Sequence, residues 1–381
     1  MIGLRFQWAQ PRAGGRIAVS VIAAVLVAAG CSSTQSTPTT AGPSATSSSP
    51  APSRTASLAP TPGDAHATGL RDDEPWLVYS WYAPGKTEKD IFLVRQDGTD
   101  DHAILGDVPG AHASPSWYPD GSAIVFAVAD ARTPNGSIWT ANADGTGPVM
   151  LADGGGACPD GVAHPTWSPD GSKLAFICYP DPGGKQGSVA TFDPATKSVT
   201  RLVTVDWPEH LDGAPTWSPD GRSLAFSILH WDATDQFLTG SLIAVVPVAG
   251  GKEQRLTTFD TNMSDPDWSP DGTELATFSY DMGNQHTTPH ASNLYLIKPD
   301  GTDLRQLTYS SVDGNMRIVQ PRWSPDGTRI VCAVAVSHAA NFTTDDLQLA
   351  FVDPLGGEPV LLSPIIHGSQ PDLRPTVRSS S

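Results

Sequence analysis

Apolar and polar positions follow one pattern that returns five times along the chain, at intervals of 50–55 residues. Each copy begins at a tryptophan, continues through a polar turn of the form Ser-Pro-Asp-Gly (Tyr-Pro-Asp-Gly in the first copy), and ends in mostly apolar residues at alternate positions. Residues two apart lie on the same face of a strand. Each copy therefore predicts a strand, a tight turn and a second strand with one apolar face. The tryptophan, aspartate and glycine of the copies are Trp117, Asp120, Gly121, Trp167, Asp170, Gly171, Trp217, Asp220, Gly221, Trp268, Asp271, Gly272, Trp323, Asp326 and Gly327.

The four residues of each turn suit a type I turn. Proline at the second position has the backbone angle that this turn requires, glycine closes the turn, and the aspartate side chain can accept hydrogen bonds from nearby amides. We expect each tryptophan to pack between neighbouring sheets. The interpretation of this repeated motif is therefore structural rather than catalytic.

Each unit continues with two more strands. A hairpin turn such as Asp97-Gly98 or Gly250-Gly251 joins them, and the fourth strand is short. Four antiparallel strands in about 50 residues are typical of one blade of a β-propeller. The third strands are predicted at residues 91–95, 138–141, 188–192, 242–246, 294–298 and 347–352.

The two ends of the repeat region predict how the ring closes. Residues 370–375 repeat residues 320–325 with Leu373 in the tryptophan position, but no second strand follows them. Residues 76–81 read as a second strand without a first strand. We therefore expect the C-terminal strand to complete the N-terminal blade. The predicted fold is an all-β, six-bladed propeller of four-stranded blades over residues 71–376, with a disordered tail at 377–381.

These repeats resemble those of the TolB-type propeller, and the resemblance extends over nearly the whole repeat region. Similar repeats occur in the propeller domains of prolyl oligopeptidase-like peptidases, but the chain has no Gly-x-Ser-x-Gly nucleophile motif. No extra N-terminal domain like that of the periplasmic translocation protein of this family is expected. The resemblance therefore implies the propeller architecture and not a particular role.

The first 70 residues predict export and a membrane tether. Residues 1–16 carry three arginines and no acid, and an apolar run from Ile17 to Ala29 is too short to span a bilayer. The run leads into Cys31, in a context that resembles the bacterial lipobox, in which the cysteine is acylated. Residues 1–30 are interpreted as a lipoprotein signal peptide, and residues 31–70 as the lipidated cysteine plus a disordered Ser/Thr/Pro-rich tether. The alternative is an ordinary signal peptide with an incidental cysteine. The predicted location is the cell membrane, lipid-anchored on its extracytoplasmic side.

Composition narrows the class of partner. The formal net charge is −17, and only 17% of residues are charged. Because an acidic surface repels the phosphate backbone, nucleic acid is excluded as a partner. The membrane, through acylated Cys31, and a protein, peptide or glycan are the expected partners.

Cysteine and histidine are the residues that could carry chemistry. Cys158 and Cys178 flank the first and second strands of one blade, so a disulfide is predicted, with two free thiols as the alternative. Cys332 replaces a phenylalanine and is expected to be buried. A rim at the mouth of the central channel is predicted from His112, His164, His210, Asp212, His286, His290 and His367. Such side chains suit a divalent metal, but scattered surface histidines explain them better, and no cofactor is predicted.

The leading functional hypothesis is a non-catalytic binding or scaffold module of the cell envelope. The alternative is a metal-dependent polysaccharide lyase or hydrolase, since some TolB-like propellers resemble lyases that use histidines at the channel mouth. In that case His164, His210 and His367 would be the ligands, with Gln370 nearby. A third possibility is a structural spacer without a small ligand.

Overall fold

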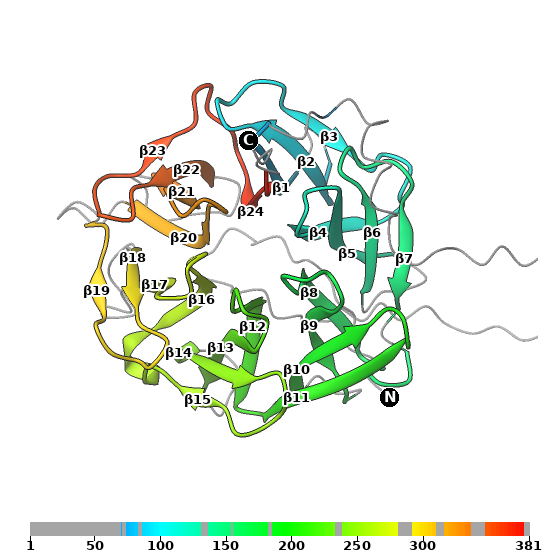
Figure 1. The fold of residues 1–381 in the computed structure, drawn as a ribbon, viewed down its shortest axis with the longest axis vertical. Coiled ribbons are helices and arrows are strands. Elements are labelled where there is room, and N and C mark those ends of the chain that lie inside the picture. Colours follow the sequence, from blue (N-terminus) through cyan, green and yellow to red (C-terminus); the bar gives the residue numbers. More distant parts are fainter. Residues whose placement is uncertain are drawn as a thin grey trace, which may run out of the picture.

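Six four-stranded antiparallel sheets surround a central axis in the computed structural model (Figure 1). This confirms the predicted six-bladed propeller. The structure describes residue 70 and residues 74–82, 86–130, 136–153, 155–181, 185–232, 238–280, 292–309, 316–336 and 347–376. The predicted signal peptide, Cys31, nearly all of the tether and the tail lie outside these ranges. Leu70, the last residue of the predicted tether, packs against the core between the first two blades.

The strands lie in the same order in every blade, with the first strand innermost and the fourth outermost. The first blade holds β24 (Ser369–Leu373), β1 (Trp76–Tyr82), β2 (Lys89–Arg95) and β3 (His102–Ile104). The second holds β4 (Ala111–Trp117), β5 (Ala123–Ala129), β6 (Ser137–Asn142) and β7 (Val149–Ala152), and the third holds β8 (Gly161–Trp167), β9 (Leu174–Tyr179), β10 (Gln186–Asp193) and β11 (Ser198–Asp206). The fourth holds β12 (Glu209–Trp217), β13 (Ser223–Trp231), β14 (Leu238–Pro247) and β15 (Gln254–Arg255), and a short 3-10 helix, η2 (Phe259–Thr261), follows it. The fifth holds β16 (Met263–Trp268), β17 (Leu275–Tyr280), β18 (Ser292–Ile297) and β19 (Arg305–Gln306), and the sixth holds β20 (Met316–Trp323), β21 (Ile330–Val336), β22 (Gln348–Val352) and β23 (Val360–Leu361).

The tight turns form as their sequence predicts. In the third blade the Gly171 amide donates to the Ser168 carbonyl at 2.8 Å, which closes a four-residue turn. The Asp170 carboxylate accepts hydrogen bonds from the Ser168 hydroxyl at 2.6 Å and from the Ser172 amide at 3.0 Å. These donors lower the pKa of Asp170. The same contacts recur at Asp220, Asp271 and Asp326.

Apolar layers between neighbouring sheets form the core. One such layer joins Ala175, Ile177 and Val189 of the third blade to Phe226 and Ile228 of the fourth. The tryptophans close these layers at one end: Trp117, Trp167 and Trp217 are buried, whereas Trp268 and Trp323 are half-buried. Cys332 is buried in the same kind of layer, as predicted from its phenylalanine-like position.

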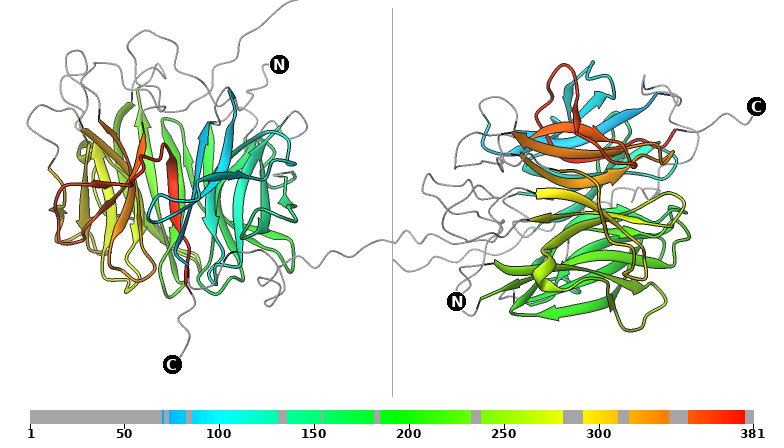
Figure 2. Two further views of the ribbon diagram at one scale, coloured as in Figure 1. Left: turned by 90° about the horizontal axis from the view of Figure 1, so that it is seen from above. Right: turned by 90° about the vertical axis from the view of Figure 1, so that its left-hand side faces the viewer.

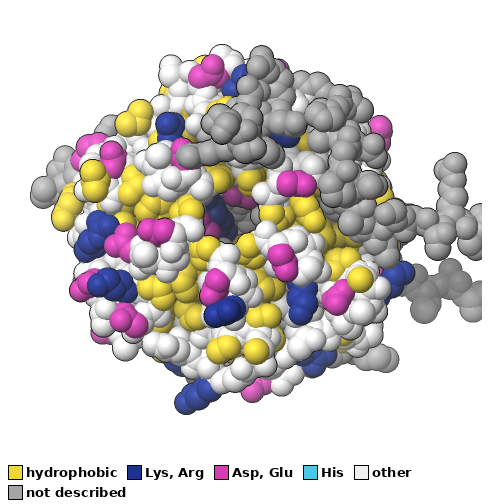
Figure 3. Space-filling view, viewed as in Figure 1, with side chains coloured by type: hydrophobic (Ala, Val, Ile, Leu, Met, Phe, Trp, Pro, Cys, Tyr) yellow, Lys and Arg dark blue, Asp and Glu magenta, His cyan; other side chains and the backbone are white. Residues whose placement is uncertain are grey.

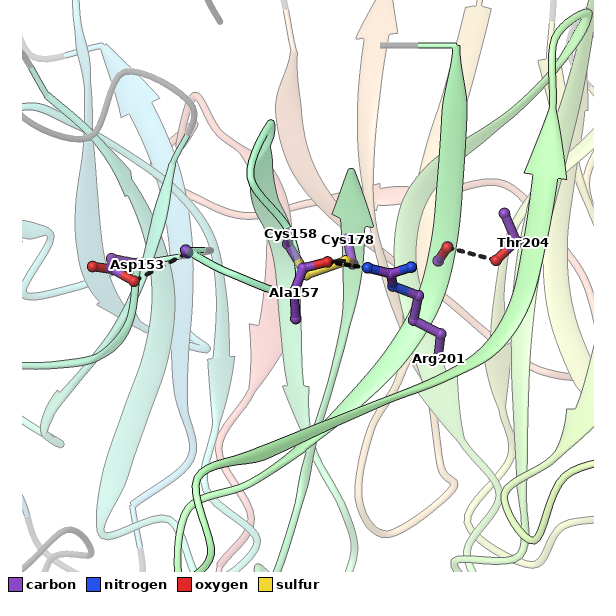
Figure 4. The surroundings of a disulfide bond; sticks show 8 residues. Asp153, Ala157, Cys158, Cys178, Arg201 and Thr204 are labelled. Carbon is purple, nitrogen blue, oxygen red and sulfur yellow. Dashed lines mark hydrogen bonds between the residues drawn. A yellow bond between two sulfur atoms is a disulfide. The ribbon is translucent and has the colours of Figure 1, made fainter. Parts of the chain in front are cut away.

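A disulfide joins Cys158 to Cys178, with an S–S distance of 2.06 Å and a Cα–Cα distance of 5.3 Å. Cys158 precedes β8, and Cys178 lies in β9, so the bond fixes the connection that enters the third blade. Figure 4 shows the Arg201 side chain directed at the Ala157 carbonyl beside the bond, and this guanidinium donates a hydrogen bond to it. The outermost strand, β11, therefore also holds this connection.

The two ends of the described chain meet in the first blade, as predicted. β24 pairs with β1 through Leu77 and Leu373 and through Val78 and Asp372. Leu373, which stands in the tryptophan position, is 2% exposed. After β24, the Arg374 amide donates to the Trp76 carbonyl at 2.8 Å. The last strand therefore closes the ring.

We expect a chain that ends after Gly368 to lose stability by at least about 3 kcal/mol, because it loses the burial of Leu373 and several hydrogen bonds of the closing strand. Urea unfolding followed by tryptophan fluorescence measures this change. A chain that ends after Thr376 is the matched control and should unfold like the full chain. Equal stability of both truncated chains would contradict closure by β24.

Candidate functional site

Strand order gives the disc two different faces. The tight turns after each innermost strand and the hairpins between third and fourth strands share one face, here called the turn face. The loops between second and third strands and the connections from blade to blade share the opposite face, here called the loop face. Figure 2 shows the disc from the side, with the strands running between its two faces. His286 and His290 belong to a loop that lies outside the described residues.

Each innermost strand contains a β-bulge near its middle. In five blades, the residue three positions before the tryptophan position has a left-handed backbone, with φ between 49° and 57°. In the fourth blade Gly213, four positions before Trp217, takes this conformation with φ 69°. A bulge redirects one side chain and leaves one amide outside the ladder. The left-handed non-glycine residues are Ser114, His164, Asp265, Gln320 and Gln370.

These redirected side chains point to the centre of the ring. The charge of Arg322 in the sixth blade acts on His164 in the third blade, which is diametrically opposite. Gln320, Arg322 and Asp265 are half-buried although they lie on innermost strands. Only side chains that reach the central channel satisfy both observations. Figure 3 shows that one face of the disc is hollowed at its centre, with acidic and basic atoms in the hollow.

A chain of hydrogen bonds runs along the channel wall through four blades. The backbone amide of Gln370 donates a hydrogen bond to Gln320 Oε1 at 2.8 Å, and the backbone amide of Ser114 donates one to Gln370 Oε1 at 3.0 Å. Gln370 Nε2 donates to Ser114 Oγ at 3.1 Å, and Ser114 Oγ lies 2.8 Å from His164 Nδ1. A side-chain oxygen of one blade thus accepts a hydrogen bond from the backbone amide that the bulge leaves unpaired in the next blade. This network links the sixth, first, second and third blades.

Residues one position before the tryptophan position fasten neighbouring blades at the channel. The Thr166 hydroxyl donates to the Pro215 carbonyl at 2.7 Å, and the Thr216 hydroxyl donates to the Pro266 carbonyl at 2.9 Å. Asp267 accepts from the Trp323 amide at 2.7 Å. Asp372 accepts from the Trp117 amide at 2.9 Å and from Ser116 Oγ at 3.0 Å. The blade-to-blade contact therefore uses two carboxylates as structural acceptors.

Burial shifts the pKa values of the channel groups. Burial raises the pKa of Asp267 to about 6, although Arg322 and the Trp323 amide act against the shift. Burial and the neighbouring charge of Asp212 raise the pKa of Asp265 to about 7. Burial lowers the pKa of His164, so its imidazole is neutral at pH 7. The channel therefore holds carboxylates that are costly to ionise.

The structure separates the residues that were predicted to form one rim. His164 and Asp212 both reach the channel and interact electrostatically. The prediction that His112 lies at the rim is wrong, because its side chain is 1% exposed and packs edge-on against Phe126 in the core. His210 lies against Trp207, with ring centroids 5.2 Å apart.

His367 is exposed and stacks on Trp81, with ring centroids 5.8 Å apart. His164, His210 and His367 thus contact different neighbours. Among the residues that the structure describes, no three or more histidine, cysteine or acidic side chains are placed to hold a metal ion together.

The prediction from sequence missed Ser114, Gln320, Arg322 and Asp267. A signal for them was present, because a proline stands two positions before every tryptophan position, including Leu373. Proline has no amide hydrogen, so in a strand it fits where the ladder is interrupted. The residue before it is the one with the left-handed backbone in five blades. These prolines are Pro115, Pro165, Pro215, Pro266, Pro321 and Pro371.

The raised pKa of Asp265 makes stability depend on pH. The folded protein holds this proton more tightly than the unfolded chain, whose aspartate has its ordinary pKa of 3.8, so stability falls as pH rises from about 4 to about 7. Asp265→Asn removes the titration and should raise the free energy of unfolding at pH 8 by about 1–3 kcal/mol, with little difference at pH 4. Urea unfolding at several pH values measures it.

Asp271→Asn is the matched control for this experiment. Hydrogen bonds in its turn lower the pKa of Asp271, so the same chemical change should weaken the fold at pH 8. An Asp265→Asn protein that is no more stable than the parent at pH 8 would contradict the analysis of the channel.

Comparisons with known proteins agree with this architecture. The structure is similar to a putative TolB from Agrobacterium tumefaciens, with a TM-score of 0.56 and 20% identity, over 78% of this chain and 91% of the other. It is also similar to TolB from Acinetobacter baumannii, with a TM-score of 0.50 and 16% identity, over 80% of this chain and 68% of the other. At these identities the similarity shows the fold alone.

A curated relative and a family model complete the comparison. The uncharacterized peptidase YuxL of Bacillus subtilis (strain 168) is 34% identical over 82 residues, which cover 22% of this chain and 11% of the relative. The chain therefore matches only a small part of that relative's length. The model of the TolB beta propeller domain (PD40) matches residues 135–375, which is more than half of the chain. The chain belongs to the TolB β-propeller family.

Proposed function

We propose that the protein is a lipid-anchored binding module on the extracytoplasmic side of the cell membrane. Its loop face and central channel would bind a protein, peptide or glycan of the cell envelope without catalysing a reaction. The observation that carries the proposal is the channel wall, where polar side chains from several blades converge on one space. A rigid disc with polar groups gathered at its centre suits recognition.

The wall's hydrogen bonds support binding over catalysis. Ser114 and His164 are in contact, but Ser114 is 5% exposed, and its hydroxyl also accepts a hydrogen bond from the Gln370 side chain. A catalytic serine must be open to its substrate and activated by a base. Ser114 is instead one member of a network that fastens blades together.

The anchor is proposed from the sequence around Cys31. Within the described ranges no helix is long and apolar enough to cross a membrane. The two chain ends of the propeller, near Trp76 and Leu373, both lie on the turn face. A tether joined at Trp76 therefore leaves the loop face unobstructed at its attachment point, which suits a role in presenting that face to a partner.

Replacement of the lipidation site tests the anchor. We expect Cys31→Ser to move the protein from the membrane fraction to the soluble extracytoplasmic fraction, because it removes the acyl chains whose methylene groups each contribute about 0.8 kcal/mol to membrane binding. Fractionation followed by immunoblotting measures the shift, and Ser32→Ala is the control that should stay membrane-bound. A Cys31→Ser protein that remains in the membrane fraction would refute lipid anchoring through this residue.

Photo-crosslinking from the two faces tests the binding role. Tyr309 follows β19 on the loop face and is 66% exposed, whereas Leu355 lies in the hairpin between β22 and β23 on the turn face and is 91% exposed. With a photo-reactive amino acid at either position, we expect an envelope partner to crosslink from position 309 and not from 355. Mass spectrometry identifies the adduct. Crosslinking from 355 alone, or from neither position, would count against the proposed binding face.

A further inference from the structure

In the part of the protein that the structure describes, the hydrogen-bond chain that links the left-handed residues of four blades does not continue through the fourth and fifth blades. At the left-handed position of the fourth blade stands Gly213, which has no side chain to offer. A Cβ atom added there would overlap Asp265 Oδ1, so the carboxylate of the fifth blade lies directly against the Gly213 backbone. The hydrogen-bond chain of the other blades ends at His164 on one side of this two-blade sector of the channel wall. It begins at Gln320 on the other side.

Asp265 and Asp212 accept no hydrogen bond from a described residue, which distinguishes them from Asp267 and Asp372 in the same channel. The backbone amide of Asp265 donates a hydrogen bond to Ser227 Oγ at 2.8 Å, but no described residue donates a hydrogen bond to its carboxylate. The Asp267 and Asp372 carboxylates each accept a hydrogen bond from a backbone amide of a neighbouring blade. Asp265 is half-buried, and burial raises the pKa of its carboxyl group. A carboxylate held there without a donor weakens the fold, so its presence needs another explanation.

The charges around this sector favour a cation. Four carboxylates, those of Asp212, Asp265, Asp267 and Asp372, interact with the single guanidinium of Arg322 or with one another. Lys89 adds a positive charge near His164 from the first blade, where its ammonium group donates to Ser369 Oγ at 3.3 Å. The aspartates still outnumber the two cations. A positively charged hydrogen-bond donor pairs more strongly with a partly buried carboxylate than with one in bulk water.

We propose that this sector binds an ammonium or guanidinium group of the envelope partner, with Asp265 as the paired carboxylate and Asp212 beside it. The inference rests on the proposed binding function and names the chemistry of the ligand. A lysine or arginine side chain, or the amino terminus of a peptide, supplies both the charge and the donors. Gly213, which has no Cβ atom, leaves the room that the Asp265 carboxylate occupies.

A lysine peptide tests the proposal directly. The probe is the blocked peptide Gly-Gly-Lys-Gly-Gly carrying a fluorophore, and its control is the same peptide with acetylated lysine, which removes the charge. We expect saturable binding of the lysine peptide to the full chain and binding at least about 10-fold weaker for the acetylated peptide. A carbodiimide, which joins amines to adjacent carboxylates, should link the lysine peptide to the tryptic fragment that contains Asp265 or Asp212.

Substitutions decide whether Asp265 is the partner. Asp265→Asn should weaken lysine-peptide binding at least about 10-fold. Asp212→Asn should weaken it less, and Asp326→Asn in a turn should leave it unchanged. Because Asp265→Asn is expected to be more stable than the parent protein at pH 8, loss of binding at that pH cannot be attributed to unfolding. Equal binding by Asp265→Asn, equal binding of the acetylated peptide, or no saturable binding would each overturn the proposal.

The crosslinking experiment separates this inference from the function on which it rests. If the partner still crosslinks from position 309 with equal efficiency in the Asp265→Asn protein, the cation site is wrong and the binding module stands. If the parent protein captures no partner from position 309, the binding module itself fails. A partner captured by the parent and lost in Asp265→Asn supports both.

Discussion

β24 and β1 come from opposite ends of the described chain, and their pairing joins the sixth blade to the first. Leu373 fills the place that a tryptophan fills in the other blades, and the buried Arg374 side chain reaches on to the second blade, where its Nε donates to the Gly121 carbonyl at 2.9 Å. The other neighbouring blades follow one another along the chain. The sixth and first blades do not, so the arrangement of the channel depends on the pairing of β24 with β1. Without closure, the network from Gln320 through Gln370 to Ser114 would have no fixed geometry.

The bulges in the innermost strands give the central channel its polar side chains. A regular strand would place all inner side chains against the neighbouring sheets, but each bulge releases an amide and redirects one side chain. In four blades the released groups bond to one another across the blade boundaries. At Gly213 and Asp265 the pattern changes, because one blade contributes only backbone and the next contributes an acid without a donor. Departure from the repeat thus marks the sector that we propose as the cation site.

The fold could be predicted from the sequence because its signals are local and repeated. Strand, turn and hairpin chemistry returns about every 50 residues, and the position of Leu373 even predicts ring closure. The channel could not be predicted in the same way, since its contacts join residues about 50 or 256 positions apart. His112 and His164 illustrate the difficulty: they precede their tryptophans by five and three residues, yet one is buried against Phe126 and the other stands at the bulge. Only the proline two positions before each tryptophan would have distinguished them.

Aspartate serves two opposite purposes in this protein. In the tight turns, hydroxyl and amide donors surround the carboxylate and lower its pKa, so ionisation of Asp170 or Asp271 strengthens the fold above the pKa of the unfolded chain. In the channel, burial raises the pKa of Asp265, and its ionisation weakens the fold over the range in which the turn aspartates already contribute fully. Hydrogen bonds within the turn explain the first group without any ligand. No described residue donates a hydrogen bond to the Asp265 carboxylate, and the ammonium or guanidinium group that we propose as its ligand would supply one and offset the stability that ionisation of Asp265 costs at neutral pH.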